Sequence, residues 1–162
     1  MNLLSDTART VYRLIRRFGV LDVTYLMHLR RGDCSSNRLS AEGYRIRTVG
    51  AGELLRLQQA NHVATQVGSA EPLGDNRRAL VAAFQDQRIV SFAWVARHSI
   101  EAEENYSRAK HLGISIDLPE GTVFVYNVWT DPEHRGKRLV AALLNHAVQR
   151  ELLGAHAMVT SI

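Results

Sequence analysis

The chain has 162 residues, 46% of them hydrophobic, and this length fits one compact domain with a substantial core rather than two domains. It contains neither an apolar run near the roughly 20 residues needed to cross a bilayer nor an N-terminal signal-like apolar core, so we expect a cytoplasmic protein. The net charge of +4 is concentrated in residues 1–43, and because the arginines are scattered rather than clustered we expect no nucleic-acid partner.

Residues 1–43 predict a helix and a strand in front of the main domain. Ser5 and Asp6 are candidate N-caps, and apolar residues then recur at i, i+3, i+4 and i+7 from Val11 to Phe18. The opposite side of this helix is rich in arginine, which suits a solvated face or, as an alternative, docking on an anionic membrane surface. Val20 to Leu29 is rich in β-forming residues and predicts a strand, and the polar segment 30–42 that follows predicts a linker.

The main domain is expected over residues 44–162 and opens with a strand and a helix. Alternation from Tyr44 to Thr48 predicts a half-buried strand, and Glu53 to Val63 predicts a helix. Ala79 to Gln85 and Ile89 to Arg97 flank a short polar turn and predict an antiparallel hairpin. Glu101 to Lys110 contains three glutamates without an apolar period, which predicts a mobile loop that could gate a substrate.

The last third of the chain predicts a strand, a helix and another strand. Thr122 to Thr130 is almost entirely β-branched or aromatic, which is typical of a central strand buried on both faces. Apolar residues at i, i+4 spacing form two adjacent rows on a helix from Leu139 to about Leu153, one of which begins at Val140. His156 to Ile162 predicts a final strand, so the fold class is a mixed α/β domain.

The turn between the Thr122 to Thr130 strand and the following helix is the best candidate for a binding site. Unpaired N–H groups in the first turn of a helix favour an anion such as a diphosphate. Arg135, Lys137 and Arg138 add positive charge there, and Gly136 permits a tight turn. Taken alone, these features are only a weak phosphate signal.

The same turn reads T-D-P-E-H-R-G-K-R-L-V-A-A-L-L and resembles the acetyl-CoA-binding motif of the GNAT superfamily, V-x-P-x-x-R-G-x-G-x-G/A followed by A-L-L. The resemblance implies a GNAT-like, mostly antiparallel sheet flanked by helices over residues 44–162, with residues 1–43 as an N-terminal helix-strand extension. Arg138 and Val140 stand where the motif has glycines. Because the diphosphate needs backbone N–H groups in helical geometry, which other residues also supply, we expect binding to survive.

The resemblance further implies an N-acetyltransferase that uses acetyl-CoA as co-substrate and acetylates an amine by direct attack on the thioester. The acceptor would be a small molecule, an amino sugar or a protein amine. The residues expected to bind acetyl-CoA lie on the strand end, the turn and the helix start: Val128, Trp129, Thr130, Arg135, Gly136, Lys137, Arg138, Leu139 and Val140.

Candidate catalytic residues are few, because the strand lacks the carboxylate that many family members place there. Tyr126 and Asn127 are its polar interior candidates and could orient a water molecule or the substrate, although such a tyrosine could also belong to the core. His98 and Glu101 could reach an acceptor amine, whereas His134 is expected to cap the loop beside the phosphates. The seven histidines show no metal-ligand spacing, so no metal is expected.

The family generally continues past the last predicted strand with a helix and further strands, which form part of the acceptor wall. Three explanations for the ending at Ile162 stay open: a truncated chain, completion by a second subunit in a homodimer, or replacement by the helix and strand of residues 1–43. An alternative function is a non-catalytic acyl-CoA-binding or assembly module with a degenerate GNAT fold. A third is a factor that docks on membranes through the arginine-rich helix.

Overall fold

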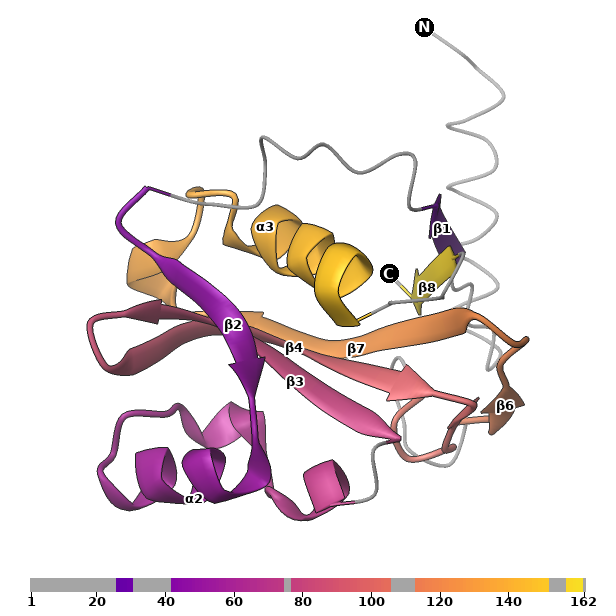
Figure 1. Cartoon of the computed structure of the whole chain (residues 1–162), viewed down its shortest axis with the longest axis horizontal. Helices are drawn as coiled ribbons and strands as arrows, with labels where there is room; N and C mark the ends of the chain where they lie inside the picture. Colours follow the sequence, from indigo (N-terminus) through magenta and orange to yellow (C-terminus); the bar gives the residue numbers. More distant parts are fainter. Residues whose placement is uncertain (1–25, 31–41, 75–76, 106–112, 152–156, 162) are drawn as a thin grey trace, which may run out of the picture.

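The computed structural model describes residues 26–30, 42–74, 77–105, 113–151 and 157–161 (Figure 1). The strands are β1 Leu26–Arg30, β2 Arg45–Val49, β3 Arg78–Gln85, β4 Arg88–Arg97, β5 Ser99–Ile100, β6 Ile116–Asp117, β7 Thr122–Thr130 and β8 Ala157–Ser161. The helices are α2 Ala51–Gln59, η3 Thr65–Val67, η4 Glu71–Gly74, η6 Pro132–His134, α3 Leu139–His146 and the π-helical turn η7 Ala147–Glu151. No helix in these ranges is long and apolar enough to cross a membrane.

Six of the strands form one mixed sheet in the order β1-β8-β7-β4-β3-β2. Neighbouring strands are antiparallel except β7 and β8, which are parallel. β5 and β6 form a separate two-stranded ribbon. The expectation of a mixed α/β fold built on a mostly antiparallel sheet is therefore confirmed.

The sheet is covered on both faces, with α3 on one face and α2 together with η3 and η4 on the other (Figure 1). Side chains of β3 and β4 are buried along almost their whole length, as apolar strands in the middle of a layered domain require. Towards α3 the core includes Val81, Val95, Val125, Leu139 and Leu143. Towards α2 it includes Leu54, Leu80, Phe84, Phe92 and Trp94.

Most element predictions agree with the structure. The hairpin of β3 and β4 turns at Asp86, whose φ of 54° suits a tight polar turn. α2 begins two residues earlier than expected and ends at Gln59, because the chain turns at Asn61 with a φ of 56°. Regular helix in α3 ends at His146 and continues as η7 to Glu151, and Val140, which begins one of the two predicted apolar rows, is 38% exposed.

A strand from the N-terminal segment joins the sheet at its outer edge. β1 pairs antiparallel with β8, from Leu26 opposite Ser161 to Arg30 opposite Ala157. β8 in turn pairs with β7, so β1, β8 and β7 lie side by side (Figure 1). The predicted helix over residues 5–18, the beginning of the strand that follows it, and residues 31–41 of the predicted linker lie outside the described residues.

Candidate active site

A bulge divides β7 into two unlike halves. Phe92 of β4 lies opposite Trp129 and Trp94 lies opposite Tyr126, so β7 takes three steps where β4 takes two. Asn127 stands at the extra position with a φ of 45°, in the left-handed region. Bulges of this kind increase local twist and redirect the strand, which prepares the second half of β7 for a different neighbour.

The second half of β7 is open on the side of β8. β8 pairs only with Thr122–Val125, so the part of the chain that the structure describes has no strand beside Tyr126–Thr130 on that side. Val123 and Val125 are buried, whereas Asn127 and Val128 are exposed. The expectation that the whole strand is buried on both faces is therefore wrong for this half, because β8 diverges from β7 after Val125.

The backbone groups of Thr130, in this open half, point towards the free edge, as the bonds of its neighbours show. The Asp131 N–H donates to the Val90 carbonyl oxygen at 2.9 Å, and the Trp129 carbonyl accepts from Ser91 Oγ at 2.9 Å. Since successive backbone groups of a strand alternate sides, the N–H and C=O of Thr130 face away from β4. Because the Thr130 carbonyl already accepts from Arg135 Nε, an extended ligand could pair with this edge through the Thr130 N–H and the second lone pair of that carbonyl.

The turn after β7 is held by its own side chains. The Asp131 carboxylate accepts from the Glu133 N–H at 3.1 Å and from Arg88 at 3.2 Å, so it caps η6 and ties it to β4. Arg135 donates from Nε to the Thr130 carbonyl at 3.3 Å, which leaves the rest of its guanidinium on the surface. These bonds direct the chain from the end of β7 over to the start of α3.

The start of α3 has the geometry of an anion site. Arg138 adopts the left-handed conformation, with a φ of 59° and a ψ of 23°, and the right-handed helix begins at the next residue. A left-handed residue followed by a right-handed one turns successive N–H groups towards one point, as in anion-binding nests. The first helical bond is donated by Ala142, and no side chain caps the helix, so the N–H groups of its first turn have no helical acceptor.

Positive charge surrounds these N–H groups. Arg135, Lys137 and Arg138 are all exposed, and Gly136 has a φ of 76°, which glycine adopts without strain. Arg138 adopts a similar φ at the position where the family motif has glycine, at a cost of about 1 kcal/mol. Leu139 is buried in the core, so its contribution to the site is its backbone, while Val140 is exposed beside it.

A second cluster lies on the α2 face of β7, around Tyr126. The Tyr126 hydroxyl donates to Glu104 Oε1 at 2.8 Å, and Arg78 forms a two-pronged ion pair with the same carboxylate at 3.1 and 2.6 Å. Burial and the hydrogen bond to Glu104 raise the pKa of Tyr126 above its ordinary value of 10.0. Burial alone would raise the pKa of Glu104, but the hydrogen bonds from Arg78 and Tyr126 outweigh it and lower that pKa.

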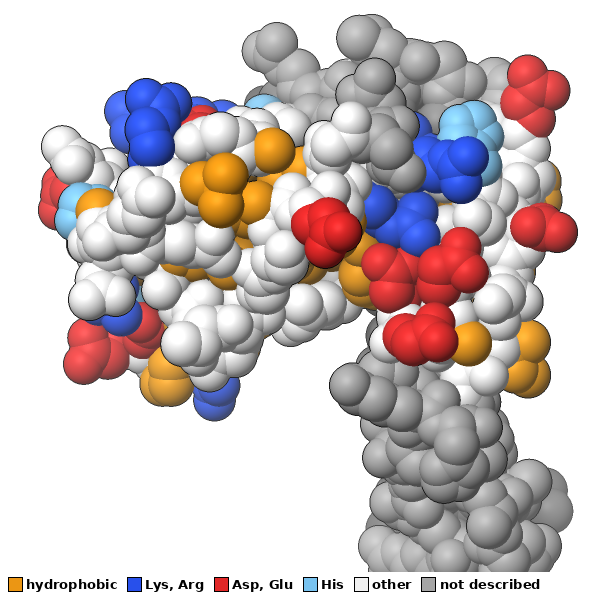
Figure 2. Space-filling view, turned by 90° about the horizontal axis from the view of Figure 1, so that it is seen from below, with side chains coloured by type: hydrophobic (Ala, Val, Ile, Leu, Met, Phe, Trp, Pro, Cys, Tyr) orange, Lys and Arg blue, Asp and Glu red, His pale blue; other side chains and the backbone are white. Residues whose placement is uncertain are grey.

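Glu104 is the site residue that sequence reasoning missed. The strand itself has no carboxylate, and the segment after β5 supplies one instead. The run of three glutamates from Glu101 to Glu104 was visible, but nothing local distinguishes the one that meets Tyr126. Glu101 and His98 are exposed, and the Glu101 N–H donates to the Glu104 carboxylate at 3.3 Å. Figure 2, which looks at this face, shows acidic side chains gathered on part of it.

The other two polar candidates have partners of their own. Asn127 is exposed rather than interior, and its Nδ2 donates to the Gln66 carbonyl at 3.2 Å, which ties the bulge to η3. His134 does not cap the loop on its surface: it is only 9% exposed, and its Nδ1 lies 2.9 Å from the Tyr44 hydroxyl. The Trp129 ring stacks on Phe92, with centroids 5.7 Å apart, so Trp129 packs against the α2-side core.

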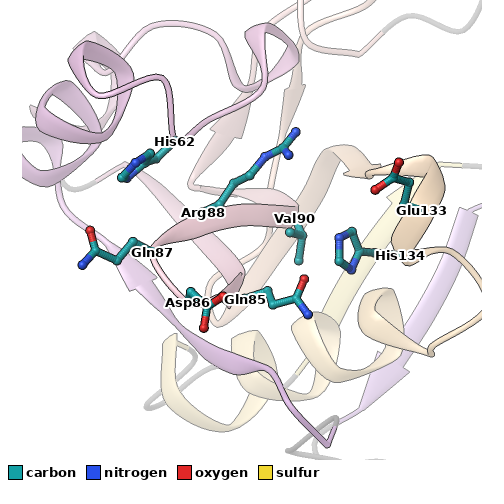
Figure 3. A pocket seen from close by; sticks show the side chains of 8 residues that line it. All are labelled: His62, Gln85, Asp86, Gln87, Arg88, Val90, Glu133 and His134. Atoms are coloured by element: carbon teal, nitrogen blue, oxygen red, sulfur yellow. The ribbon is translucent and has the colours of Figure 1, made fainter.

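A polar pocket of about 600 Å³ lies on the other side of the turn, with Glu133 and His134 on one wall and the β3–β4 turn on the other (Figure 3). It contains the carboxylates of Asp86 and Glu133, so a diphosphate is better accommodated at the cationic start of α3. Asp131, Glu133 and His134 bring possible metal ligands within 4.8 Å of one another. However, Arg88 already neutralises the Asp131 carboxylate, which disfavours a cation there.

Comparisons with known proteins agree with the sequence motif. A family model described as "Acetyltransferase (GNAT) family" matches residues 52–160. A GCN5-related N-acetyltransferase from Kribbella flavida has a similar fold, with a TM-score of 0.51 and 16% identity, over 94% of this chain and 53% of that one. This chain thus spans about half the length of the Kribbella protein.

Two further solved structures align less closely. A ribosomal-protein-alanine N-acetyltransferase from Brucella melitensis biovar Abortus 2308 aligns with a TM-score of 0.39 and 18% identity, over 72% of this chain and 78% of that one. A glucosamine-6-phosphate N-acetyltransferase from Arabidopsis thaliana aligns with a TM-score of 0.38 and 15% identity, over 74% and 82%. No curated protein sequence matches the chain.

Proposed function

Because the chain belongs to the GNAT acetyltransferase family, we propose that it transfers an acetyl group from acetyl-CoA to an amine acceptor. One observation supports this proposal above the others. Among the described residues, the bulged half of β7 has no strand on the side of β8, and the chain leads from it through η6 to the uncapped first turn of α3. An extended chain with a diphosphate at one end, which describes acetyl-CoA, matches an open strand edge that leads to an anion site.

Acetyl-CoA would bind along two adjoining stretches of backbone. The free edge of β7 at Val128 and Thr130, on either side of Trp129, would pair with the amide groups of the pantetheine arm. The turn and helix start, residues 135–140, would bind the diphosphate through backbone N–H groups, with the nearby cationic side chains adding attraction. Arg138 and Val140 do not prevent this binding, because Arg138 already has the left-handed conformation of the motif's glycine and Val140 is exposed.

Direct attack needs an amine that has lost its proton. The amine nitrogen would form a bond to the thioester carbon while the carbon–sulfur bond breaks, the thiolate leaves, and the amine proton passes to water. Glu104 suits a counter-ion better than a general base, because its lowered pKa makes it a weak proton acceptor. Tyr126, with its raised pKa, would stay protonated and orient the amine through its oxygen lone pairs.

The charge on this face supports a cationic acceptor. Glu101 and Glu103 are exposed and Glu104 is partly exposed, and all three lie on the segment that meets Tyr126. A group of carboxylates raises the local concentration of a protonated amine. We therefore propose a small amine or amino sugar as the acceptor class, bound on the α2 face next to Tyr126 and to Asn127 at the bulge.

Two measurements test this function. Acetyl-CoA at about 100 times its Kd should stabilise the protein by about 2.7 kcal/mol, which a thermal unfolding experiment detects. Release of free CoA thiol should then follow when amines from a small-molecule and amino-sugar panel are added. Absence of any stabilisation at millimolar acetyl-CoA would contradict the proposal.

A non-catalytic acyl-CoA-binding module is the second candidate, and one observation favours it. The Glu104 carboxylate, next to Tyr126, forms a bidentate ion pair with Arg78, whose side chain is only 8% exposed. A carboxylate bound in this way cannot accept a proton without breaking an ion pair. Tight acetyl-CoA binding without thiol release across the amine panel would support this candidate.

We also propose that residues 1–43 complete the fold rather than form a separate appendage. β8 has β7 on one side and β1 on the other. Without β1, β8 would be an edge strand with β7 as its single neighbour. Met27 and Thr160 lie opposite each other in the pairing of β1 and β8. The substitutions Met27→Cys and Thr160→Cys, made together with Cys34→Ser, should therefore allow a disulfide between the two strands. A cross-link within one chain supports completion in the same chain, a cross-linked dimer supports a second subunit, and no cross-link contradicts both.

A further inference from the structure

Tyr44 connects the start of β2 to the turn after β7. Its hydroxyl lies 2.9 Å from His134 Nδ1, a residue 90 positions further along the chain, and it accepts from Lys137 Nζ at 3.0 Å. The rings of Tyr44 and His134 meet edge to face, with centroids 5.7 Å apart, and Lys137 Nζ lies 5.7 Å from the Tyr44 ring centroid. One side chain therefore contacts the turn on both sides of Gly136.

The bonding pattern at this hydroxyl is set by what each partner can donate. The Lys137 ammonium has only donors, so the Tyr44 oxygen must accept from it. In the tautomer of His134 that carries its proton on Nε2, Nδ1 accepts the hydroxyl proton, and in the other tautomer Nδ1–H donates to the second lone pair of the Tyr44 oxygen. Either tautomer therefore keeps Tyr44 hydrogen-bonded to both His134 and Lys137.

Tyr44 is itself anchored to the sheet. It is partly buried and packs against the core cluster on the α3 side, which includes Leu139 and Leu143 of that helix. Figure 1 shows the start of β2 beside the turn that joins β7 to α3. The hydroxyl is thus a fixed point relative to the sheet and the helix start.

The turn needs such a fixed point. Gly136 and Arg138 both have positive φ, of 76° and 59°, and they lie on either side of Lys137. At a positive φ the backbone of Arg138 is strained, whereas glycine would adopt the same φ without strain. A contact that holds His134 and Lys137 restrains the segment between them and so favours the backbone arrangement in which the N–H groups converge.

We propose that Tyr44 is a positioning residue of the diphosphate-binding turn, acting through His134 and Lys137, and this inference rests on the proposed function. Tyr44 would contact neither the acetyl group nor the acceptor. Its loss should weaken ligands that contain the diphosphate and leave ligands without it unaffected. A residue that only stabilised the fold would not produce this selectivity.

The test compares Tyr44→Phe with the unmodified protein. Phenylalanine keeps the ring against the core and against His134 but removes the hydroxyl, so the fold should persist, as thermal unfolding can verify. Gln58→Ala is the matched control, because it removes one exposed hydrogen bond, to the Gly68 carbonyl, on the opposite face of the sheet. Tryptophan fluorescence titrations would measure Kd for acetyl-CoA, CoA and S-acetylpantetheine, which lacks the diphosphate and the nucleotide.

We expect Tyr44→Phe to raise the Kd for acetyl-CoA and CoA by about 5- to 20-fold, in line with the loss of a charge-assisted hydrogen bond, and Gln58→Ala to leave it unchanged. The response to S-acetylpantetheine should be the same for all three proteins. An unchanged Kd for acetyl-CoA in Tyr44→Phe, or an equal loss of affinity for S-acetylpantetheine, overturns the role of Tyr44 but leaves the proposed function standing. Failure of the unmodified protein to bind acetyl-CoA overturns the proposed function, and this inference with it.

Discussion

The two halves of β7 have similar side chains and different surroundings. Thr122–Val125 lies between β4 and β8, whereas Tyr126–Thr130 has β4 on one side and, in the part of the chain that the structure describes, no strand on the other. Three valines in this strand show the contrast, since Val123 and Val125 are 2% and 0% exposed and Val128 is 38% exposed. Hydrophobic content therefore does not decide burial here: the bulge at Asn127 and the departure of β8 do.

This contrast explains how one strand can serve two purposes. The first half gains stability from apolar burial on both faces. The second half leaves the backbone groups of Thr130 facing away from β4 and exposes the Val128 side chain to solvent. The same substitution should therefore change stability and acetyl-CoA affinity differently in the two halves.

The largest difference should come from the same substitution in each half. Val125→Ala removes two buried methyl groups and should lower the free energy of unfolding by about 2–3 kcal/mol through lost burial and a cavity. Val128→Ala should change it by less than about 0.5 kcal/mol. Urea unfolding of both variants measures the two values, and similar losses would refute the division of the strand.

Asn127→Val should remove the boundary between the halves. A β-branched residue fits a φ of 45° poorly, so we expect a loss of about 1–2 kcal/mol of stability and roughly a tenfold weaker binding of acetyl-CoA as the open edge is distorted. Asn127→Gly is the control, because glycine keeps the positive φ and loses only the bond to the Gln66 carbonyl. Calorimetric titration should separate the variants, and equal affinities would show that the bulge is not needed.

Glu104→Gln tests the charged cluster beside the open half through its pH dependence. A folded-state pKa below the ordinary 4.5 means that ionised Glu104 adds stability above that pH and loses the contribution as the pH falls through the lowered value. At pH 7 the variant should therefore be less stable by about 1 kcal/mol, and the difference should shrink as the pH falls below the ordinary 4.5 and disappear once it is below the lowered pKa.

The control for that pH experiment is Glu53→Gln. The hydrogen bond from Arg47 lowers the pKa of Glu53 in the same way, but Glu53 lies on α2, and its bond to Arg47 is local, six residues along the chain. Both variants should lose the acid-dependent part of their stability, measured by unfolding at a series of pH values. Only Glu104→Gln should also reduce turnover, so equal turnover in both would show that Glu104 has no part in the reaction.

The smallest effect should come from Arg138→Gly. Glycine relieves the strain of a left-handed φ and should raise stability by about 0.5–1 kcal/mol, while acetyl-CoA affinity should change by no more than a few-fold because the backbone N–H groups remain. Arg135→Gly is the comparison, since Arg135 has a φ of −67° and gains nothing from glycine. A loss of stability in Arg138→Gly would mean that the arginine side chain contributes more than its backbone conformation costs.

Much of the fold could be predicted from local patterns. β7 has the bounds expected from its β-branched and aromatic run, and the β3–β4 hairpin follows from two apolar runs around a polar turn. Runs of apolar residues and polar turns involve residues that are close in the sequence, so the sequence alone is enough to recognise them. The C-terminal end of α2 could not be placed, because Asn61 turns the chain where the apolar pattern still continues.

The site was only partly predictable. The turn from Arg135 to Val140 was found because its motif is contiguous, and its phosphate-binding role stays a prediction. The bulge was not found, since it depends on the register between β7 and β4. Glu104 meets Tyr126 across 22 residues and Tyr44 meets His134 across 90, and contacts of that kind have no signature in the intervening sequence.

The sequence by itself determined the mixed α/β fold class, the strand and helix that frame the turn, and the family, because each depends on residue types at short, fixed spacing. The tertiary structure decided which half of β7 is buried, which carboxylate lies beside Tyr126, and which side chain holds the turn from outside. Those outcomes depend on how strands pair and diverge and on where distant segments meet. In β7, the divergence of β8 after Val125 makes the difference between a core strand and an open edge.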